Sequence, residues 1–293
     1  MNRFEDRLAE ADVLIADGAT GTMLQEVGVP PVSLNLDRPD VVRKLHQDYI
    51  AAGAELILTN TFAGSRPQLE RMGLGDKLRR INLAAARLAR ETAGDKALVL
   101  GDIGPTGQLL RPLGNLSYKE AVSFFAEQAT TLAEGAVDAI LIETMSDIDE
   151  IKAAVEGVRR VSDLPIIASM SFDTHVHTMM GVRPDIAAVE LSRLEVAAIG
   201  ANCGRTLSDN LRAIQQMRTA APAAVLMAKP NAGLPRMKAG NAVYSVTPQE
   251  MANYARKFVG LGVKIFGGCC GTTPGHIRAI TNALRNKHQN SDE

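Results

Sequence analysis

The 293-residue sequence contains no tryptophan, only four tyrosines and only three cysteines. Three cysteines cannot all pair within one chain, which argues against the disulfide framework of a small secreted protein. The formal net charge of −1 gives neither the basic surface of a nucleic-acid-binding protein nor a polybasic membrane segment. No apolar run approaches the roughly 20 residues that a membrane-spanning helix needs. We therefore expect neither nucleic acid nor a membrane among the partners.

The sequence gives no sign of a targeting segment or of a second domain. The first residues, "MNRFEDRLAEADVL", are charged and lack the apolar stretch of a secretory signal, so we predict a cytoplasmic protein. The length and a hydrophobic fraction of 46% suit one large domain, and no linker or change of composition divides it. We predict one domain over residues 1–287 and a flexible tail over residues 288–293.

Short apolar runs alternate with amphipathic helical segments along the chain. Eight runs read as strands buried on both faces: residues 13–17, 55–59, 97–102, 138–143, 165–170, 196–202, 223–228 and 263–267. Helices are indicated between them, for example after Ser117, a predicted N-cap, and after Thr247, which forms a capping-box pattern with Glu250. Eight β–α alternations predict a single (β/α)8 TIM barrel, with a doubly wound sheet as the alternative.

The three cysteines all follow predicted strands. Active sites of such barrels lie where the strands end, so segments after the strands should face one pocket. Cys203 follows the sixth run, and Cys269 and Cys270 follow the eighth. Neighbouring residues on a strand point apart, and the glycines Gly267, Gly268 and Gly271 are expected to permit the turn that lets two adjacent cysteines face one point.

Three thiolates at one rim suit a tetrahedral zinc ion with one open position. Such an electron-rich site activates water poorly, but it can hold a substrate thiol as a nucleophilic thiolate. The residues therefore favour alkyl transfer to sulfur. Two other interpretations stay open at this point: cysteines that merely pack in the core, and a redox dithiol, although a disulfide between neighbours is strained.

Several motifs occur in an order that points to a known family. They are "DGATGTMLQ", "TNTF", "GDIGPTG", "ETMSD", "GANCG", "PNAGLP" and "GGCCGTTPGHI", which together span about residues 17–277. The chain resembles the homocysteine S-methyltransferase family, and within it the homocysteine-binding modules of cobalamin-dependent methionine synthases. The resemblance implies a zinc-bearing barrel with Cys203, Cys269 and Cys270 as ligands. It also implies that the sulfur of homocysteine becomes the fourth ligand and accepts a methyl group, which gives methionine.

An amino-acid substrate requires carboxylates for its ammonium group and N–H donors for its carboxylate. Asp17 and Glu143 end two predicted strands, and the family motifs imply that they bind the ammonium group. The backbone amides of a small-residue turn are candidates to bind the carboxylate, and two further residues are expected to shape the pocket. These are Gly18, Ala19 and Thr20 in the turn, and Asn60 and Phe62 in the pocket. Asn231 is a candidate to supply an oxygen ligand to zinc before the substrate binds.

Two functions of other classes remain as alternatives. Asp173, His175 and His177 form a "DTHVH" motif that in a hydrolase would bind a metal, with the cysteines in a structural role. The chain would alternatively be a non-catalytic zinc-binding subunit of a partner. The motif is offset from the predicted end of its strand, which favours a loop-packing role.

More than one methyl donor is compatible with these residues. The chain ends after the module that it resembles, so we expect the donor to be a separate methyl-corrinoid protein. A small sulfonium compound such as S-methylmethionine is the alternative. Enzymes that use betaine enclose its quaternary ammonium with aromatics, including tryptophan, which is absent here. The stretch "VSLNLDRPD" also differs from the "NPLW" type of sequence associated with S-methylmethionine enzymes.

Overall fold

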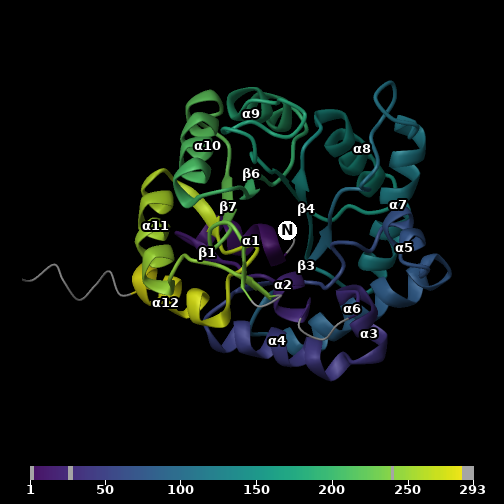
Figure 1. The fold of residues 1–293 in the computed structure, drawn as a ribbon, viewed down its shortest axis with the longest axis horizontal. Coiled ribbons are helices and arrows are strands. Elements are labelled where there is room, and N and C mark those ends of the chain that lie inside the picture. The colour runs from purple at the N-terminus through teal and green to yellow at the C-terminus, as the bar shows by residue number, and fades with distance from the viewer. Residues whose placement is uncertain (1–2, 26–28, 239–240, 286–293) are drawn as a thin grey trace, which may run out of the picture.

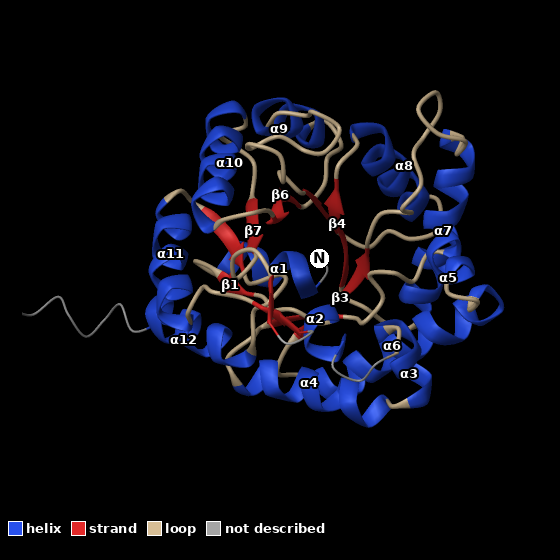
Figure 2. Cartoon of the chain, in the orientation of Figure 1, coloured by secondary structure: helices blue, strands red, loops and turns tan. Residues whose placement is uncertain are grey.

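The computed structural model describes residues 3–25, 29–238 and 241–285, so the predicted tail at residues 288–293 lies outside the described residues. Eight parallel strands form one sheet in the order β1-β10-β7-β6-β5-β4-β3-β2. A parallel bridge between Ala16 and Leu56 joins the two ends of this order. The helices surround the ring of strands (Figures 1 and 2). The single (β/α)8 TIM barrel is thus confirmed. A doubly wound sheet is excluded because the two edge strands of such an open sheet do not pair with each other.

Each predicted apolar run overlaps one barrel strand. The strands are β1 (Leu14–Ile15), β2 (Leu56–Leu58), β3 (Leu98–Ile103), β4 (Ala139–Met145), β5 (Ile166–Met170), β6 (Ala198–Cys203), β7 (Leu226–Pro230) and β10 (Val263–Phe266). Alternate residues face opposite sides, as pleating requires. Leu14, Leu100 and Ile265 pack inside the barrel, whereas Ile15, Val99 and Phe266 pack between the strands and the helices. Burial on both faces explains why the runs are continuously apolar.

The barrel is closed at its N-terminal end by a helix that the sequence analysis did not predict. Helix α1 (Arg3–Glu10) has acids and arginines on its outer side, but Phe4 and Leu8, one turn apart, are buried. Both pack with the residues inside the barrel, and Figure 1 shows α1 within the ring of strands. The amphipathic plug leaves the opposite, C-terminal end of the barrel as the open one.

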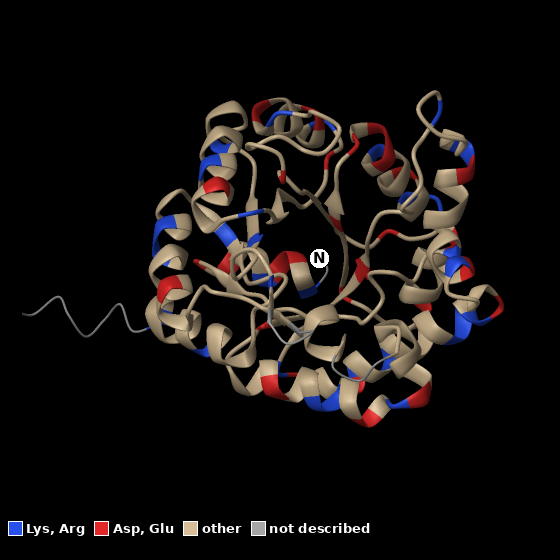
Figure 3. Ribbon diagram, in the orientation of Figure 1, with Lys and Arg blue, Asp and Glu red and all other residues tan. Residues whose placement is uncertain are grey.

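The helices that cover the strands follow the predicted pattern. They are α4 (Pro39–Ala51), α6 (Leu78–Ala93), α7 (Tyr118–Glu134), α8 (Ile148–Arg159), α9 (Pro184–Ser192), α10 (Leu207–Ala220), α11 (Pro248–Gly260) and α12 (Pro274–Arg285). The charged residues are spread over these helices (Figure 3). Ser117 caps α7 in a complete capping box, and Thr247 with Glu250 forms another at α11, which confirms both predicted helix starts.

Shorter elements occupy the loops at the open end. They are α2 (Gly21–Leu24), η2 (Pro31–Ser33) and α3 (Leu34–Asp37) after β1, α5 (Arg66–Arg71) and η3 (Gly75–Lys77) after β2, and the antiparallel pair β8 (Arg236–Lys238) and β9 (Asn241–Val243) after β7. The sequence analysis did not predict this last pair. Within the described residues, no helix is long and apolar enough to cross a membrane.

Candidate functional site

A cavity of about 270 Å³ lies at the C-terminal ends of the strands. The last residues of β2, β3, β4, β6 and β7 and the segments after β1, β2 and β10 contribute to its wall, as the barrel topology predicts. Most of the predicted site residues line it: Gly18, Ala19, Thr20, Asn60, Phe62, Glu143, Cys203, Cys269 and Cys270. Residues as far apart in the sequence as Gly18 and Cys270 therefore share one small space, and Asp102 and Lys229 also line it.

The three cysteines meet at the edge of this cavity. Their Sγ atoms all lie within 4.8 Å of one another, and the Sγ atoms of Cys203 and Cys269 are 3.0 Å apart. In the part of the chain that the structure describes, this is the one cluster of cysteine, histidine or acidic side chains that could hold a metal ion. Four ligands at about 2.3 Å around a tetrahedral zinc ion would place sulfurs about 3.8 Å apart, so three thiolates can close around one ion with a small adjustment.

Two unusual backbone conformations bring the cysteines together. Cys203 itself has a φ of 57°, in the left-handed region that non-glycine residues seldom adopt. Gly271 has a φ of 77° and makes the turn after the adjacent pair, where a Cβ atom would lie 2.1 Å from the ring of Tyr244. Gly268 is needed for a different reason than the predicted turn, because a Cβ atom there would lie 2.4 Å from Thr272 Oγ1.

The thiols interact strongly with one another. Hydrogen bonds with Cys269 and Cys270, together with burial, raise the pKa of the Cys203 thiol well above its usual value. Hydrogen bonds from Cys203 and Cys269 lower the pKa of Cys270 to about 4. Two neighbouring thiols thus stabilise one thiolate. A divalent metal ion bound here would replace the protons that the three sulfurs share.

Asn202 links the cysteines to the end of β4, which carries Glu143, a connection that the sequence analysis missed. Its Oδ1 accepts hydrogen bonds from the Thr144 amide at 2.8 Å and from Ser169 Oγ at 2.7 Å. Its Nδ2 donates to Thr144 Oγ1 at 2.6 Å and points to Cys269 Sγ at 3.9 Å. Thr144 has a φ of 63°, which is strained for a β-branched residue. Asn202 therefore holds a strained residue beside Glu143 and also contacts the Cys269 thiol.

Acidic groups and one lysine occupy the bottom of the cavity. Lys229 is 2% exposed, and its Nζ lies 2.9 Å from Asp17 Oδ1. Burial lowers the pKa of Lys229, but the charges of Asp17 and Glu143 outweigh it and raise the pKa above the usual value. Burial and the Cys269 charge raise the pKa of Glu143 to about 8. The sequence analysis assigned no role to Lys229 or Asp102, although a lysine that ends an apolar run requires a buried acid partner.

The predicted small-residue turn and pocket residues are held by hydrogen bonds of their own. A Cβ atom at Gly18 would lie 2.7 Å from Thr272 Oγ1, so only glycine fits there. The Ala19 amide donates to Thr272 Oγ1 and is already used. Asn60 Nδ2 donates to Pro31 O at 2.6 Å and ties the loops after β1 and β2 together.

The remaining predicted residues lie outside the cavity wall. Asn231 donates through Nδ2 to Gly204 O at 2.7 Å, while its Oδ1 is buried without a hydrogen-bond partner. His177 Nδ1 lies 3.0 Å from the backbone oxygen of His175, and Asp173 accepts from Ser171 Oγ. Asp173, His175 and His177 form no metal-binding cluster within the described residues.

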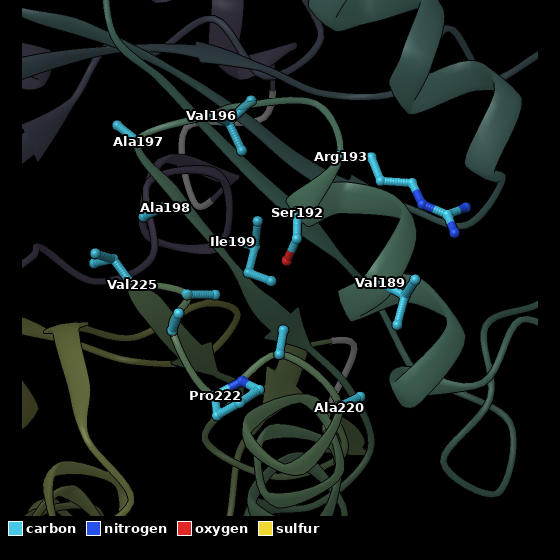
Figure 4. Close-up of a pocket in the computed structure, with 13 residues that line it drawn as sticks. Val189, Ser192, Arg193, Val196, Ala197, Ala198, Ile199, Ala220, Pro222 and Val225 are labelled. Atoms are coloured by element: carbon cyan, nitrogen blue, oxygen red, sulfur yellow. The ribbon is translucent and has the colours of Figure 1, made fainter.

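A second hollow of about 520 Å³ lies between α9, α10 and the beginnings of β6 and β7, at the other end of the barrel. Its wall is mostly aliphatic, with Val189, Ile199 and Val225 among the residues that Figure 4 labels. Its one charged residue, Arg193, pairs with Glu190. The hollow lacks converging polar groups, so the cavity at the strand ends is the candidate site.

Comparisons with known proteins identify the family of the chain. The family model for homocysteine S-methyltransferase matches residues 14–284. Methionine synthase of Mycobacterium leprae is 34% identical over 297 residues, which cover 93% of this chain and 24% of the relative. Methionine synthase of Mycobacterium tuberculosis is 34% identical over 299 residues, which cover 94% of this chain and 25% of the relative. The chain thus spans about a quarter of the length of these curated relatives.

A solved structure shows the same fold. The homocysteine methyltransferase MmuM from Escherichia coli, in its metallated form, superposes with a TM-score of 0.79 at 23% identity and covers 96% of this chain and 98% of its own. The family model matches nearly the whole barrel, and the mycobacterial proteins are 34% identical. These two findings assign the family. The chain belongs to the homocysteine S-methyltransferase family.

Proposed function

We propose that the chain transfers a methyl group to the thiol of homocysteine, giving methionine, with zinc held by Cys203, Cys269 and Cys270. The observation that carries this proposal is the convergence of the three Sγ atoms within 4.8 Å beside a cavity of about 270 Å³ with buried acids. Bound there, zinc would keep the acceptor sulfur as a thiolate at neutral pH. The buried, unpartnered Oδ1 of Asn231, which follows β7, supports this residue as an oxygen ligand before substrate binds.

The chain's own residues would bind and orient the acceptor. Glu143 lines the cavity with one buried, unpartnered oxygen and would bind the ammonium group. The backbone amides of Gly18 and Thr20 would bind the carboxylate of the acceptor. The third amide of the predicted turn, that of Ala19, already donates to Thr272. Held in this way, the acceptor sulfur forms a bond to the methyl carbon as the donor's bond to that carbon breaks. The barrel domain proposed over residues 1–287 would supply all of these groups.

The rim of the cavity supports a protein as the methyl donor. Most exposed large hydrophobic side chains of the described residues follow strand ends: Val29, Phe62, Leu109, Leu113, Met179, Leu234, Met237 and Val243. Apolar side chains gathered at one end of a molecule are typical of an interaction surface. We propose that a methyl-corrinoid protein docks on this apolar rim and delivers the methyl group into the cavity.

A panel of methyl donors tests the proposed function. Zinc-loaded protein with homocysteine and a methylated corrinoid protein is expected to produce methionine, whereas S-methylmethionine is expected to produce little. Leu113→Asp and Met179→Asp together should slow transfer from the protein donor by about tenfold, as for loss of an interface anchor. Val161→Asp, at the N-terminal end, is the matched control. Faster turnover with S-methylmethionine than with the corrinoid protein would exclude the protein donor and favour the small sulfonium compound.

Asn202→Ala is expected to weaken zinc binding by about 10- to 100-fold, as loss of a residue that orients metal ligands does in other sites. The reason is the loss of the contacts to Cys269 Sγ and to strained Thr144. Competition with a chromogenic chelator measures the affinity, and Asn253→Ala, at an exposed position of α11, is the control. Adding Thr144→Gly to Asn202→Ala should recover part of the affinity, because glycine accepts the positive φ. Wild-type zinc affinity in Asn202→Ala would contradict the role.

A further inference from the structure

Thr272 lies behind the cavity wall, between two segments that line the cavity. It follows the adjacent cysteines by two positions, is fully buried and is not itself part of the wall. Its Oγ1 accepts a hydrogen bond from the Ala19 amide at 2.9 Å and donates one to the Cys269 backbone oxygen at 2.7 Å. Ala19 and Cys269 both line the cavity. One hydroxyl group therefore joins the small-residue turn after β1 to the backbone of the cysteine pair after β10.

Further hydrogen bonds join the same two segments. Tyr49, on α4, is fully buried, and its Oη donates to the Ala19 backbone oxygen at 2.7 Å and lies 3.2 Å from the Thr272 backbone oxygen. The Gly268 amide donates to the backbone oxygen of Asp17 at 3.0 Å. The turn and the cysteine segment are thus tied together by side chains from two helical layers and by their own backbones.

The packing around Thr272 leaves no space for the two segments to move past each other. A Cβ atom at Gly18 would lie 2.7 Å from Thr272 Oγ1, and a Cβ atom at Gly268 would lie 2.4 Å from the same atom. Both distances are far below an ordinary van der Waals contact, so a glycine packs against the threonine on each side. A densely packed contact of this kind resists displacement. The Thr272 side chain therefore fixes the separation between the turn and the cysteine backbone.

This separation determines which acceptor fits. In the proposed function the amides of Gly18 and Thr20 bind the carboxylate of the acceptor, and the cysteine cluster holds its sulfur. Free cysteine is one methylene group shorter than homocysteine between these two groups. One methylene group changes the preference of a pocket by about 10- to 200-fold, and a misplacement of about 1 Å can cost 100-fold in rate.

We propose that Thr272, supported by Tyr49, is a positioning residue that sets the length of the acceptor and thereby selects homocysteine over free cysteine. The inference rests on the proposed function and adds the residue that determines its thiol specificity. Neither side chain lines the cavity, so both act through the segments that they join.

The test measures the preference for homocysteine over free cysteine, both as the ratio of kcat/KM and as the ratio of Kd from calorimetry on zinc-loaded protein without a methyl donor. The wild-type protein should prefer homocysteine by at least about tenfold. Thr272→Val, which keeps the shape but removes the hydroxyl group, should lower this ratio by about tenfold, mainly through weaker binding of homocysteine. Thr272→Ser should retain most of the preference. Tyr49→Phe should lower it less, and it replaces Thr272→Val if that variant fails to fold.

Thr281→Val is the matched control. Thr281 Oγ1 also bonds to two backbone oxygens, those of Ala52 at 3.0 Å and Ile277 at 2.9 Å, but it joins α12 to the chain after α4 and does not contact a segment of the cavity wall. Its loss should change the preference by less than about twofold, as expected of a distant site, even if the urea midpoint falls. Metal analysis of each variant verifies that both thiols are compared on zinc-loaded protein.

Two results would overturn the inference. One is a Thr272→Val protein that binds both thiols more weakly by the same factor, which is the effect of a merely structural residue. The other is a wild-type protein that binds free cysteine as tightly as homocysteine. A wild-type protein that binds homocysteine selectively but methylates neither thiol would instead overturn the proposed function.

Discussion

Cys269→Ser is expected to remove bound zinc and abolish methyl transfer to homocysteine while the barrel stays folded. Serine keeps the size of the side chain but is a poor ligand, and Cys269 Sγ lies 3.0 Å from Cys203 Sγ at the centre of the cluster. The zinc affinity should fall by more than about 100-fold. That is the largest loss expected when a residue that only orients the metal ligands is removed, and Cys269 is itself a proposed ligand. Metal analysis of the purified protein, circular dichroism and a methylation assay measure the three outcomes.

The cysteine prediction has a simple control. Val161→Ser places a new hydroxyl on a half-exposed site between α8 and β5, at the opposite end of the barrel, and should keep zinc and activity. Cys203→Ser should behave like Cys269→Ser, although the two residues are on different strands. A Cys269→Ser protein that still holds one equivalent of zinc would show that the thiols are not the ligands.

Asp17→Ala is expected to lower the free energy of unfolding by about 3–5 kcal/mol, because it leaves a buried ammonium group without its partner. Lys229 is 2% exposed, and the carboxylate of Asp17 also accepts the Leu58 amide. Urea denaturation at neutral pH, followed by circular dichroism, measures the change in unfolding free energy.

A double-mutant cycle separates the pair from the rest of the core. Adding Lys229→Met to Asp17→Ala should recover much of the lost stability, because the second change removes the unpaired charge. The exposed pair of Arg38 and Asp40 is the matched comparison, and Asp40→Ala should leave the denaturation midpoint almost unchanged. If the double variant is no more stable than Asp17→Ala, an unpaired Lys229 is not the cause of the lost stability.

The strands and the cluster of three cysteines could be predicted because their signals are local. Strands buried on both faces are continuously apolar, so each of the eight runs identified its strand without any knowledge of its neighbours. The capping boxes at Ser117 and Thr247 depend on residues three positions apart and were predicted for the same reason. Once eight alternations indicate a barrel, the strand ends must converge, and Cys203 comes to lie beside Cys269 and Cys270.

The helix and the hairpin that escaped prediction have weak local signals. Helix α1 has only two large apolar side chains, Phe4 and Leu8, in eight residues, and it is stabilised by the N-terminal end of the barrel that it fills. The pair β8 and β9 consists of two three-residue strands outside the main sheet. Neither would be stable by itself, because so short an element depends on tertiary contacts.

The sequence by itself determined the barrel, its open end and the identity of the thiol cluster, because apolar periodicity and cysteine placement are properties of the chain. Only the tertiary structure decided how the charges pair. Lys229 and Asp17 are 212 positions apart, and their contact at 2.9 Å arises because β1 and β7 both flank β10. Asn202, with its bonds to Thr144 and Ser169, is a similar case across β4, β5 and β6. Pairing of buried polar groups depends on strand order and register, which a linear pattern of residues does not contain.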